Sequence, residues 1–325
     1  MSNPTDKILF TLHKKSGSFI SGQALADSLG VSRAAVWKVV ESLRADGYVI
    51  ESASARGYRL TSVPDRLGER EITLGLKTAV LGHRVVSLSE TDSTNSDAAR
   101  LAAEGAPEGT LVVADSQRAG RGRLGRKWVS PPGVNVYMSL ILRPRISPAE
   151  APMITLAAAA ALAGAVNGLY GLGAGIKWPN DLLIGGKKCA GILTEMSAEP
   201  DTVRHVILGI GMDVNMAEEE FPAEIRGIAT SLMIETGRRL DRPELVRRFL
   251  EEFERVYGLL TAGDRKAVLE LWRGMSVTLG RRVRVSGPRG DITGFAKDLN
   301  DDGNLVVVME DGTLNTVISG DVYPA

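Results

Sequence analysis

The residues best suited to chemistry in this 325-residue chain are concentrated in one short segment rich in arginine and glycine. Residues 117–128 read Gln-Arg-Ala-Gly-Arg-Gly-Arg-Leu-Gly-Arg-Lys-Trp, with five cations, three glycines and no acid. Glycines let a backbone approach a ligand closely, and guanidinium groups on such a loop bind phosphate or carboxylate. A solvated basic loop or a nucleic-acid contact is the alternative, but the Gly-Arg alternation between Gln117 and Trp128 favours an anionic ligand. The segment has no Walker pattern, and we expect no βαβ unit around it, so it is not a Rossmann fingerprint.

A second segment, 177–181, reads Lys-Trp-Pro-Asn-Asp and is expected to follow a short strand. Lys177 on such a turn places a positive charge against a phosphate or carboxylate, although an isolated lysine is usually a solvated group. The apolar runs on either side of Gly185-Gly186 predict a hairpin. This hairpin would bring Gly191 and Leu193 to the same site.

A third polar segment, Ser93-Thr94-Asn95, directly follows a predicted strand. Its side chains suit the start of the next helix, where they accept hydrogen bonds from backbone N–H groups. The same hydroxyls and amide also suit the neutral polar head of a ligand, such as a ureido ring. The residues alone leave both interpretations open.

These segments need a frame, and residues 66–273 predict one large domain that supplies it. The strand-like runs cover 84–88, 110–114, 134–142 and 204–212, and the helical runs cover 96–104, 152–170 and 242–260. Several strands follow one another without a helical crossover, so we expect a mainly antiparallel sheet. The apolar stretch 151–169 is long enough to span a membrane, but its small residues with Thr155 and Asn167 favour a helix buried against the sheet.

Residues 275–325 differ in character and predict a small SH3-like barrel. The expected strands are 277–279, 282–285, 291–296, 304–309 and 313–318. They are separated by glycines and by two Asp-Gly pairs, and Asp-Gly between alternating apolar runs is typical of hairpins.

Residues 1–63 predict a winged helix-turn-helix. Helical runs at 7–12, 21–29 and 32–43 precede two short strand-like runs, and 64–71 is expected to be a linker. Ser32 is the expected N-cap of the third helix, in which the valines are core residues. Trp37 could face DNA or pack internally, and we expect it to pack. The whole chain is therefore expected to be α+β, with a central mixed α/β domain between the two small ones.

The charge of the chain is balanced overall but not in its first segment. Lys and Arg total 39, as do Asp and Glu, whereas residues 1–63 hold eight bases and five acids, an excess of three positive charges. This local bias suits DNA, although a helical domain without a DNA role is the alternative. The expected DNA-binding residues are Ser32, Arg33, Lys38, Arg56 and Arg59.

The lone cysteine, Cys189, bears on both compartment and chemistry. One thiol forms no internal disulfide, which fits a reducing compartment. A thiolate nucleophile needs an activating partner, and no histidine lies near Cys189 in sequence, so we expect a small core residue. The N-terminus lacks the features of a signal peptide. We therefore expect a cytoplasmic protein.

In this order, the three polar segments resemble the bacterial biotin protein ligases that double as biotin operon repressors. The runs 209–215 and 29–36 also resemble this family, so the likeness covers essentially the whole chain. The resemblance implies that Ser93, Thr94, Asn95 and Gln117 hold the biotin head group and that Trp128 faces adenine. The complete set of implied ligand-binding residues is Ser93, Thr94, Asn95, Gln117, Gly120, Arg121, Gly122, Arg123, Trp128, Lys177, Gly191 and Leu193.

The resemblance also implies a reaction. Biotin and ATP, with Mg²⁺, would give biotinyl-5′-AMP and pyrophosphate, and biotin would pass to a lysine of a biotin carboxyl carrier protein. Arg123 and Lys177 would be catalytic because they neutralise and align the two reacting anions. The adenylate-bound form would be a homodimer that represses at operator DNA, without a membrane role.

Two alternatives are a lipoate-type protein ligase and a non-catalytic repressor that only senses biotin. The helix-turn-helix and the Gly-Arg loop argue against the first, and the presence of Arg123 and Lys177 argues against the second. The resemblance departs at the C-terminus. Some members of the family place an arginine there against the nucleotide, whereas residues 320–325 read Gly-Asp-Val-Tyr-Pro-Ala.

Overall fold

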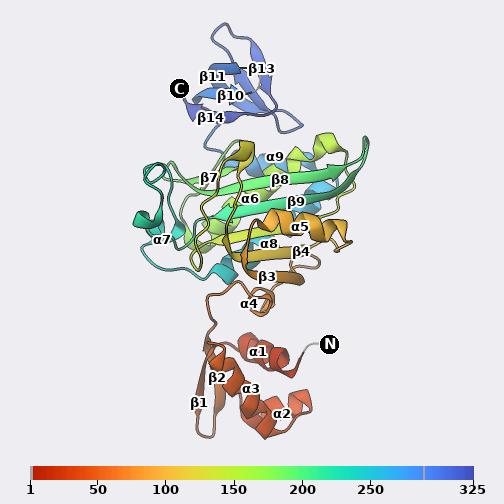
Figure 1. Cartoon of the computed structure of the whole chain (residues 1–325), viewed down its shortest axis with the longest axis vertical. Helices are drawn as coiled ribbons and strands as arrows, with labels where there is room; N and C mark the ends of the chain where they lie inside the picture. Colours follow the sequence, from red (N-terminus) through yellow and green to blue (C-terminus); the bar gives the residue numbers. More distant parts are fainter. Residues whose placement is uncertain (1–2, 288–289) are drawn as a thin grey trace. The chain divides into compact units, whose positions relative to one another are not determined.

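The computed structural model describes residues 3–287 and 290–325 and divides the chain into two compact units, Met1–Lys77 and Thr78–Ala325 (Figure 1). Each unit has its own buried core, and each is described by itself below.

The first unit is a winged helix-turn-helix, as the sequence predicts. Three helices precede a two-stranded antiparallel hairpin: α1 (Pro4–Lys14), α2 (Gly22–Leu29), α3 (Arg33–Ala45), β1 (Val49–Ala53) and β2 (Gly57–Ser62). Ser21 and Ser32 cap α2 and α3, since each hydroxyl accepts a hydrogen bond from a backbone N–H one turn later. Gly30 makes the left-handed turn between them with φ of 65°.

The expected linker at 64–71 is instead partly helical and packs on the first unit. Helix α4 (Glu69–Thr73) buries Glu71, whose carboxylate accepts hydrogen bonds from Tyr48 at 2.5 Å and Arg66 at 2.8 Å. Arg70 is ion-paired with Asp6 at 2.9 Å. These partners lie up to 64 positions away in the chain, so the local composition gave no sign of them.

The second unit is built on a seven-stranded sheet, which is mainly antiparallel as expected. Its spatial order is β3 (Arg84–Thr91), β4 (Thr110–Gln117), β5 (Val136–Leu142), β9 (Val203–Met212), β8 (Lys187–Ala198), β7 (Asp181–Ile184) and β6 (Gly175–Lys177). Only the pair β3–β4 is parallel within this sheet, and α5 (Thr94–Ala103) connects the two strands. The expectation of no βαβ unit is therefore wrong. The arginine–glycine loop follows the second strand of this unit, whereas a Rossmann loop follows the first.

Helices cover both faces of this sheet. Figure 1 shows α5 in front of it and α6 (Pro152–Tyr170) and α8 (Arg242–Thr261) behind it, and the short helices α7 (Leu232–Thr236) and α9 (Arg265–Gly274) complete the set. In the described residues, α6 belongs to one segment long and apolar enough to cross a membrane, but 67% of that segment is buried, and α6 packs against α8 and α9. It is a core helix, as the sequence favours.

The last 44 residues form a five-stranded antiparallel sheet that fits the expected SH3-like barrel. Its order is β13 (Leu314–Val317), β12 (Leu305–Val308), β11 (Gly290–Leu299), β10 (Arg282–Gly287) and β14 (Asp321–Pro324). Two predictions here are wrong. Residues 277–279 are not a strand, because Val277 donates its N–H to Ile176 of the central sheet, and β14 was not expected.

The separate cores allow the two units to be tested apart. Leu43 is fully buried in the first unit, so Leu43→Ala is expected to lower that unit's free energy of unfolding by about 2–5 kcal/mol. Urea unfolding followed by Trp37 fluorescence would show an earlier transition, while near-UV circular dichroism would report the second unit, whose transition should not move. Val49→Ala, at a 52% exposed position, is the control. Parallel loss of both transitions would contradict the division into units.

Candidate active site

A cavity of about 810 Å³ in the second unit collects eleven of the twelve residues expected to bind ligand. It is lined by β8, β9, the arginine–glycine loop, the β6–β7 turn and strands β10 and β14 of the barrel. The exception is Gly120, which is buried beneath the loop and accepts a hydrogen bond from the N–H of Trp128 at 2.9 Å. A Cβ on Gly120 would lie 2.5 Å from that residue's carbonyl oxygen, so Gly120 positions Trp128 and does not line the cavity.

One end of the cavity is polar and uncharged. The backbone N–H of Thr94 donates to Gln117 Oε1 at 3.0 Å, and the buried Ser139 Oγ lies 2.8 Å from Thr94 Oγ1 and 2.6 Å from Asn95 Oδ1. Ser93 stands at the N-cap of α5 but makes no side-chain capping bond, so the capping interpretation of this segment fails there. Hydroxyls and amides held at fixed positions in this way present both donors and acceptors to a neutral ligand.

Gly209 makes room for this polar end. A Cβ on Gly209 would lie 2.0 Å from Asn95 Oδ1. Asn95 reaches over the strand because that side chain is absent, and its Nδ2 donates to Glu195 at 2.6 Å. Sequence reasoning did not single out Ser139 or Glu195, since neither lies near the polar motif in the chain.

The arginine–glycine loop closes on itself and directs different arginines to different places. The N–H of Gly122 donates to the carbonyl of Arg126 at 2.7 Å. Arg118 points away and pairs with Glu90 and Asp92 on the surface. Arg121 reaches toward the polar end, where it lies 3.5 Å from Glu195.

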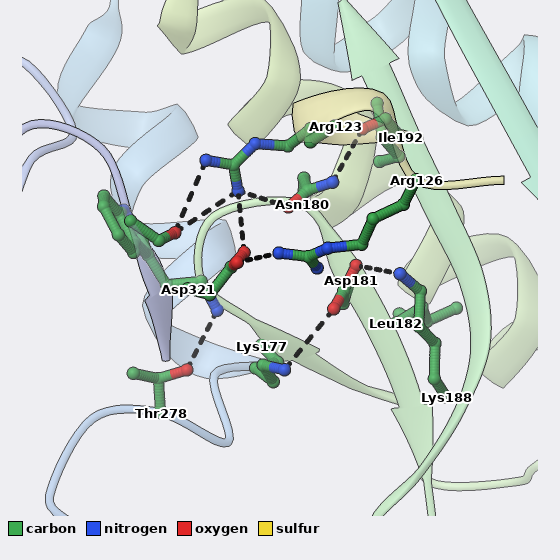
Figure 2. Close-up of polar contacts among 12 residues, drawn as sticks. Arg123, Arg126, Lys177, Asn180, Asp181, Leu182, Lys188, Ile192, Thr278 and Asp321 are labelled. Atoms are coloured by element: carbon green, nitrogen blue, oxygen red, sulfur yellow. Dashed lines mark hydrogen bonds and ion pairs between the residues drawn. The ribbon is translucent and has the colours of Figure 1, made fainter. Parts of the chain in front are cut away.

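Arg123 and Arg126 point into the cavity and meet a carboxylate from the barrel (Figure 2). Arg123 donates to Asn180 Oδ1 at 2.9 Å and lies 3.9 Å from Asp321, and Arg126 pairs with the other oxygen of Asp321. Burial lowers the pKa of the Arg123 guanidinium, which is nevertheless far above neutrality and stays charged.

Two lysines share a second carboxylate beside these arginines. Asp181 lies 3.5 Å from Lys177 Nζ and 2.5 Å from Lys188 Nζ (Figure 2). Lys188 also lies over the ring of Trp128, 5.4 Å from its centroid, whereas Lys177 faces Tyr323 of the barrel at 5.7 Å. Lys188 is therefore nearer the middle of the cavity. The sequence prediction missed it, although it stands in the predicted hairpin two residues after Gly186.

Trp128 divides the cavity from the side of the loop. A Cβ on Gly211 would lie 2.6 Å from the indole ring, so the ring rests directly on the backbone of β9. Beyond it the lining is apolar and includes Met216, Phe221 and Ile225. Sequence reasoning missed this end because no polar pattern marks it.

A buried acid lies at this apolar end. Asp213 accepts a hydrogen bond from Asn135 Nδ2 at 2.9 Å, and burial raises its pKa well above the usual range, which the charge of Lys188 only partly offsets. Cys189 is fully buried, and burial raises the pKa of its thiol. It is a core residue, as expected, and not a nucleophile.

The expected DNA-binding residues are also found together on the first unit, on α3 and the hairpin. Arg33 and Lys38 are exposed on α3, while Ser32 caps it. Arg56 and Arg59 both lie over the ring of Phe19, at 4.2 and 4.6 Å from its centroid, and Arg59 also pairs with Glu51 at 2.5 Å. Phe19 was not predicted, and it holds both wing arginines on one side of the hairpin.

Trp37 contradicts the sequence prediction. Its neighbours Val36 and Val40 are fully buried and Val39 is half-buried, but Trp37 is 54% exposed. The tryptophan therefore stands on the solvent-facing side of α3, between Arg33 and Lys38.

Comparison with known proteins accounts for all three regions. A model of the biotin/lipoate A/B protein ligase family matches residues 87–213, a helix-turn-helix model matches 5–59, and a biotin protein ligase C-terminal domain model matches 278–323. The bifunctional ligase/repressor BirA of Bacillus subtilis (strain 168) is 43% identical over 323 residues, which cover 99% of each chain. This chain belongs to the family of bifunctional biotin ligases and repressors.

Two further relatives support the assignment to the biotin ligase/repressor family. BirA of Escherichia coli (strain K12) is 30% identical over 306 residues, covering 94% of this chain and 93% of its own. The solved structure of the biotin protein ligase from Aquifex aeolicus in complex with biotin and ATP is 31% identical, with a TM-score of 0.64, and covers 74% of this chain and 98% of that one. The ligase fold and the helix-turn-helix are thus both family features.

Gly209 provides a direct test of the polar end in this family member. Gly209→Ala is expected to weaken biotin binding about ten- to a hundred-fold, because the new methyl displaces Asn95 from a packed site. Isothermal titration with biotin measures the change. Gly164→Ala on α6, where a Cβ meets nothing within 4 Å, is the matched control and should bind as the unaltered chain does. Unchanged binding by Gly209→Ala would exclude this end as the head-group site.

Proposed function

We propose that this chain joins biotin to ATP as biotinyl-5′-AMP, transfers biotin to a lysine of a biotin carboxyl carrier protein, and represses transcription in its adenylate-bound form. One observation carries the ligase half. A single cavity joins an uncharged polar end to a cluster of four cations, as a neutral head group attached to a carboxylate requires. The winged helix-turn-helix and the bifunctional relatives support the repressor half.

The polar end suits the ureido ring of biotin. A ureido group has two N–H donors and a carbonyl acceptor, and it carries no charge. Thr94, Asn95 and Gln117 offer hydroxyl and amide groups whose directions are fixed by hydrogen bonds to Ser139 and to one another. Buried polar groups that are already oriented favour a ligand that pairs with them and disfavour one that leaves them unpaired.

The cationic cluster suits the reaction that follows. A carboxylate oxygen of biotin attacks the α-phosphorus of ATP, the bond to the β-phosphate oxygen breaks, and pyrophosphate leaves. The two reactants repel each other, so their charges must be neutralised and their atoms aligned before the bond forms. Arg123, Lys177 and Lys188 supply this charge from three segments of the chain. No nucleophilic side chain is required.

The positions of the two lysines suggest different tasks. Lys188 lies against Trp128, midway between the polar end and the barrel, and is better placed for the junction of carboxylate and α-phosphate. Lys177 faces the barrel and is better placed for the remaining phosphates. This revises the assignment of the junction to Lys177 that the family resemblance suggested, while keeping Lys177 among the catalytic residues.

Mg²⁺ would accompany the triphosphate. Within residues 3–287 and 290–325, no three His, Cys, Asp or Glu side chains gather into a metal site. This fits an ion whose ligands are mainly phosphate oxygens and water, to which Asp181 or Asp321 could add one oxygen. The ion would neutralise part of the phosphate charge.

The partners follow from the same activities. The second step needs the amine of an acceptor lysine, which attacks the acyl carbon and releases AMP. Repression needs operator DNA, and we expect the adenylate-bound form to bind it as a homodimer. Acceptor and operator would both be met in the cytoplasm.

The first test is direct detection of the intermediate. Full-length protein, Mg²⁺ and ATP labelled at the α-phosphate should yield labelled adenylate and pyrophosphate with biotin. With lipoate in place of biotin we expect none, because its dithiolane ring cannot pair with Thr94 and Asn95. Adenylate from lipoate would support the lipoate-type ligase. Biotin binding without any adenylate would support the non-catalytic repressor.

The lysine assignment has its own test. Lys188→Met keeps the stem over Trp128 but removes the charge, and it is expected to slow adenylate formation by about 10²–10³-fold. Lys177→Met should cost about ten-fold. Lys187→Met, the neighbouring residue on the same strand that does not line the cavity, should be as active as the unaltered chain. If Lys177→Met proved the more damaging change in single-turnover assays, the two tasks would be exchanged.

A further inference from the structure

An unusually exposed tryptophan stands on the solvent face of α3 (Figure 1). Trp37 is 54% exposed, whereas Trp178 and Trp272 are 2% and 0% exposed. The buried side of the helix is already complete, since Val36, Val40 and Leu43 fill it. A large aromatic ring that could cover 150–250 Å² is therefore left in water by the fold of the first unit.

The surroundings of this ring indicate the kind of partner that covers it. Arg33 lies one turn before Trp37 on the same face, and Lys38 follows it directly. Arg56 is exposed on the hairpin, where the ring of Phe19 holds it. An apolar ring flanked by cations fits a polyanion that also presents an apolar group. In duplex DNA, the phosphates supply the charge and the C5 methyl of thymine supplies the apolar group, which is accessible in the major groove.

The position of Trp37 within α3 agrees with such a contact. In helix-turn-helix proteins, the N-terminal residues of the recognition helix meet the base edges. Trp37 is the fifth residue of α3, whose N-cap is Ser32. At 3.6 residues per turn, Arg33 and Trp37 point in the same direction.

We propose that Trp37 is a base-reading residue of the DNA interface and contacts a thymine methyl in the major groove, while Arg33 and Lys38 hold the phosphates. This inference rests on the proposed DNA binding. It adds an element of sequence specificity that the cations do not provide, because phosphate contacts are the same at every base pair.

The experiment compares thymine with uracil, which lacks only the methyl. The probe is a duplex selected from a random pool by the full-length chain with biotin, ATP and Mg²⁺. Each thymine is then replaced singly by deoxyuridine, and affinity is measured by fluorescence anisotropy. We expect one position in each half-site at which the unaltered chain binds the uracil duplex about four-fold more weakly, the effect of one lost methyl contact.

Variants of α3 assign that loss to a side chain. Trp37→Ala and Trp37→Gln should bind thymine and uracil duplexes equally at that position. Both should keep their fold by circular dichroism, because the ring is exposed. Lys38→Ala is the matched control, since it should weaken both duplexes alike and reduce the slope of log affinity against log salt by about 0.9.

The outcomes separate the two levels of the argument. A uracil penalty that persists in both Trp37 variants would overturn the inference and leave DNA binding intact. Failure of the unaltered chain to enrich any duplex would overturn the repressor half of the proposed function, and the inference with it. A change in oligomeric state in the Trp37 variants, without a change in thymine preference, would assign the ring to a contact between copies and also overturn the inference.

Discussion

Four cations held within one cavity are the constraint on which the catalytic half of this protein depends. Arg123, Arg126, Lys177 and Lys188 repel one another, and burial removes part of the water that would screen them. Two carboxylates make the arrangement stable without ligand. Asp181 lies between the two lysines, and Asp321 lies between the two arginines (Figure 2). Anionic ligands that enter can take over the pairing that these carboxylates provide.

This arrangement explains why the barrel matters to the site although it lacks the arginine found in some relatives. Asp321 and Tyr323 reach the cavity from β14, and Trp178 of the central unit donates its indole N–H to the carbonyl of Gly303 at 3.1 Å. The C-terminal strand thus acts on the catalytic arginines through a negative charge. A short strand that supplies one carboxylate has no strong local pattern, and the sequence accordingly failed to predict β14.

What the sequence predicted and missed follows from the range of the interactions involved. The Gly-Arg loop, the serine caps of α2 and α3 and the Gly-Gly hairpin are local, so their residues are read directly from the chain. Ser139, Lys188 and the apolar wall around Phe221 join the cavity only through sheet register and folding. Helix α4 was read as a linker because its stabilising partners, Tyr48 and Asp6, lie far away. Trp37 was placed in the core because hydrophobicity alone predicts burial, whereas the helix had already filled its buried face with valine and leucine.

The division into two units limits how ligand can control DNA. All the residues that line the cavity belong to the second unit, and the recognition helix belongs to the first, which has a core of its own. Adenylate therefore cannot change DNA affinity by touching the DNA-binding residues. It must favour a state of the whole protein that binds DNA better, and it can shift that equilibrium only by its difference in affinity between the two states. A typical coupling of about 1–3 kcal/mol corresponds to about 5–150-fold in operator affinity. A homodimer on a two-fold operator is the simplest such state, because pairing two recognition helices makes a moderate coupling act on both half-sites at once.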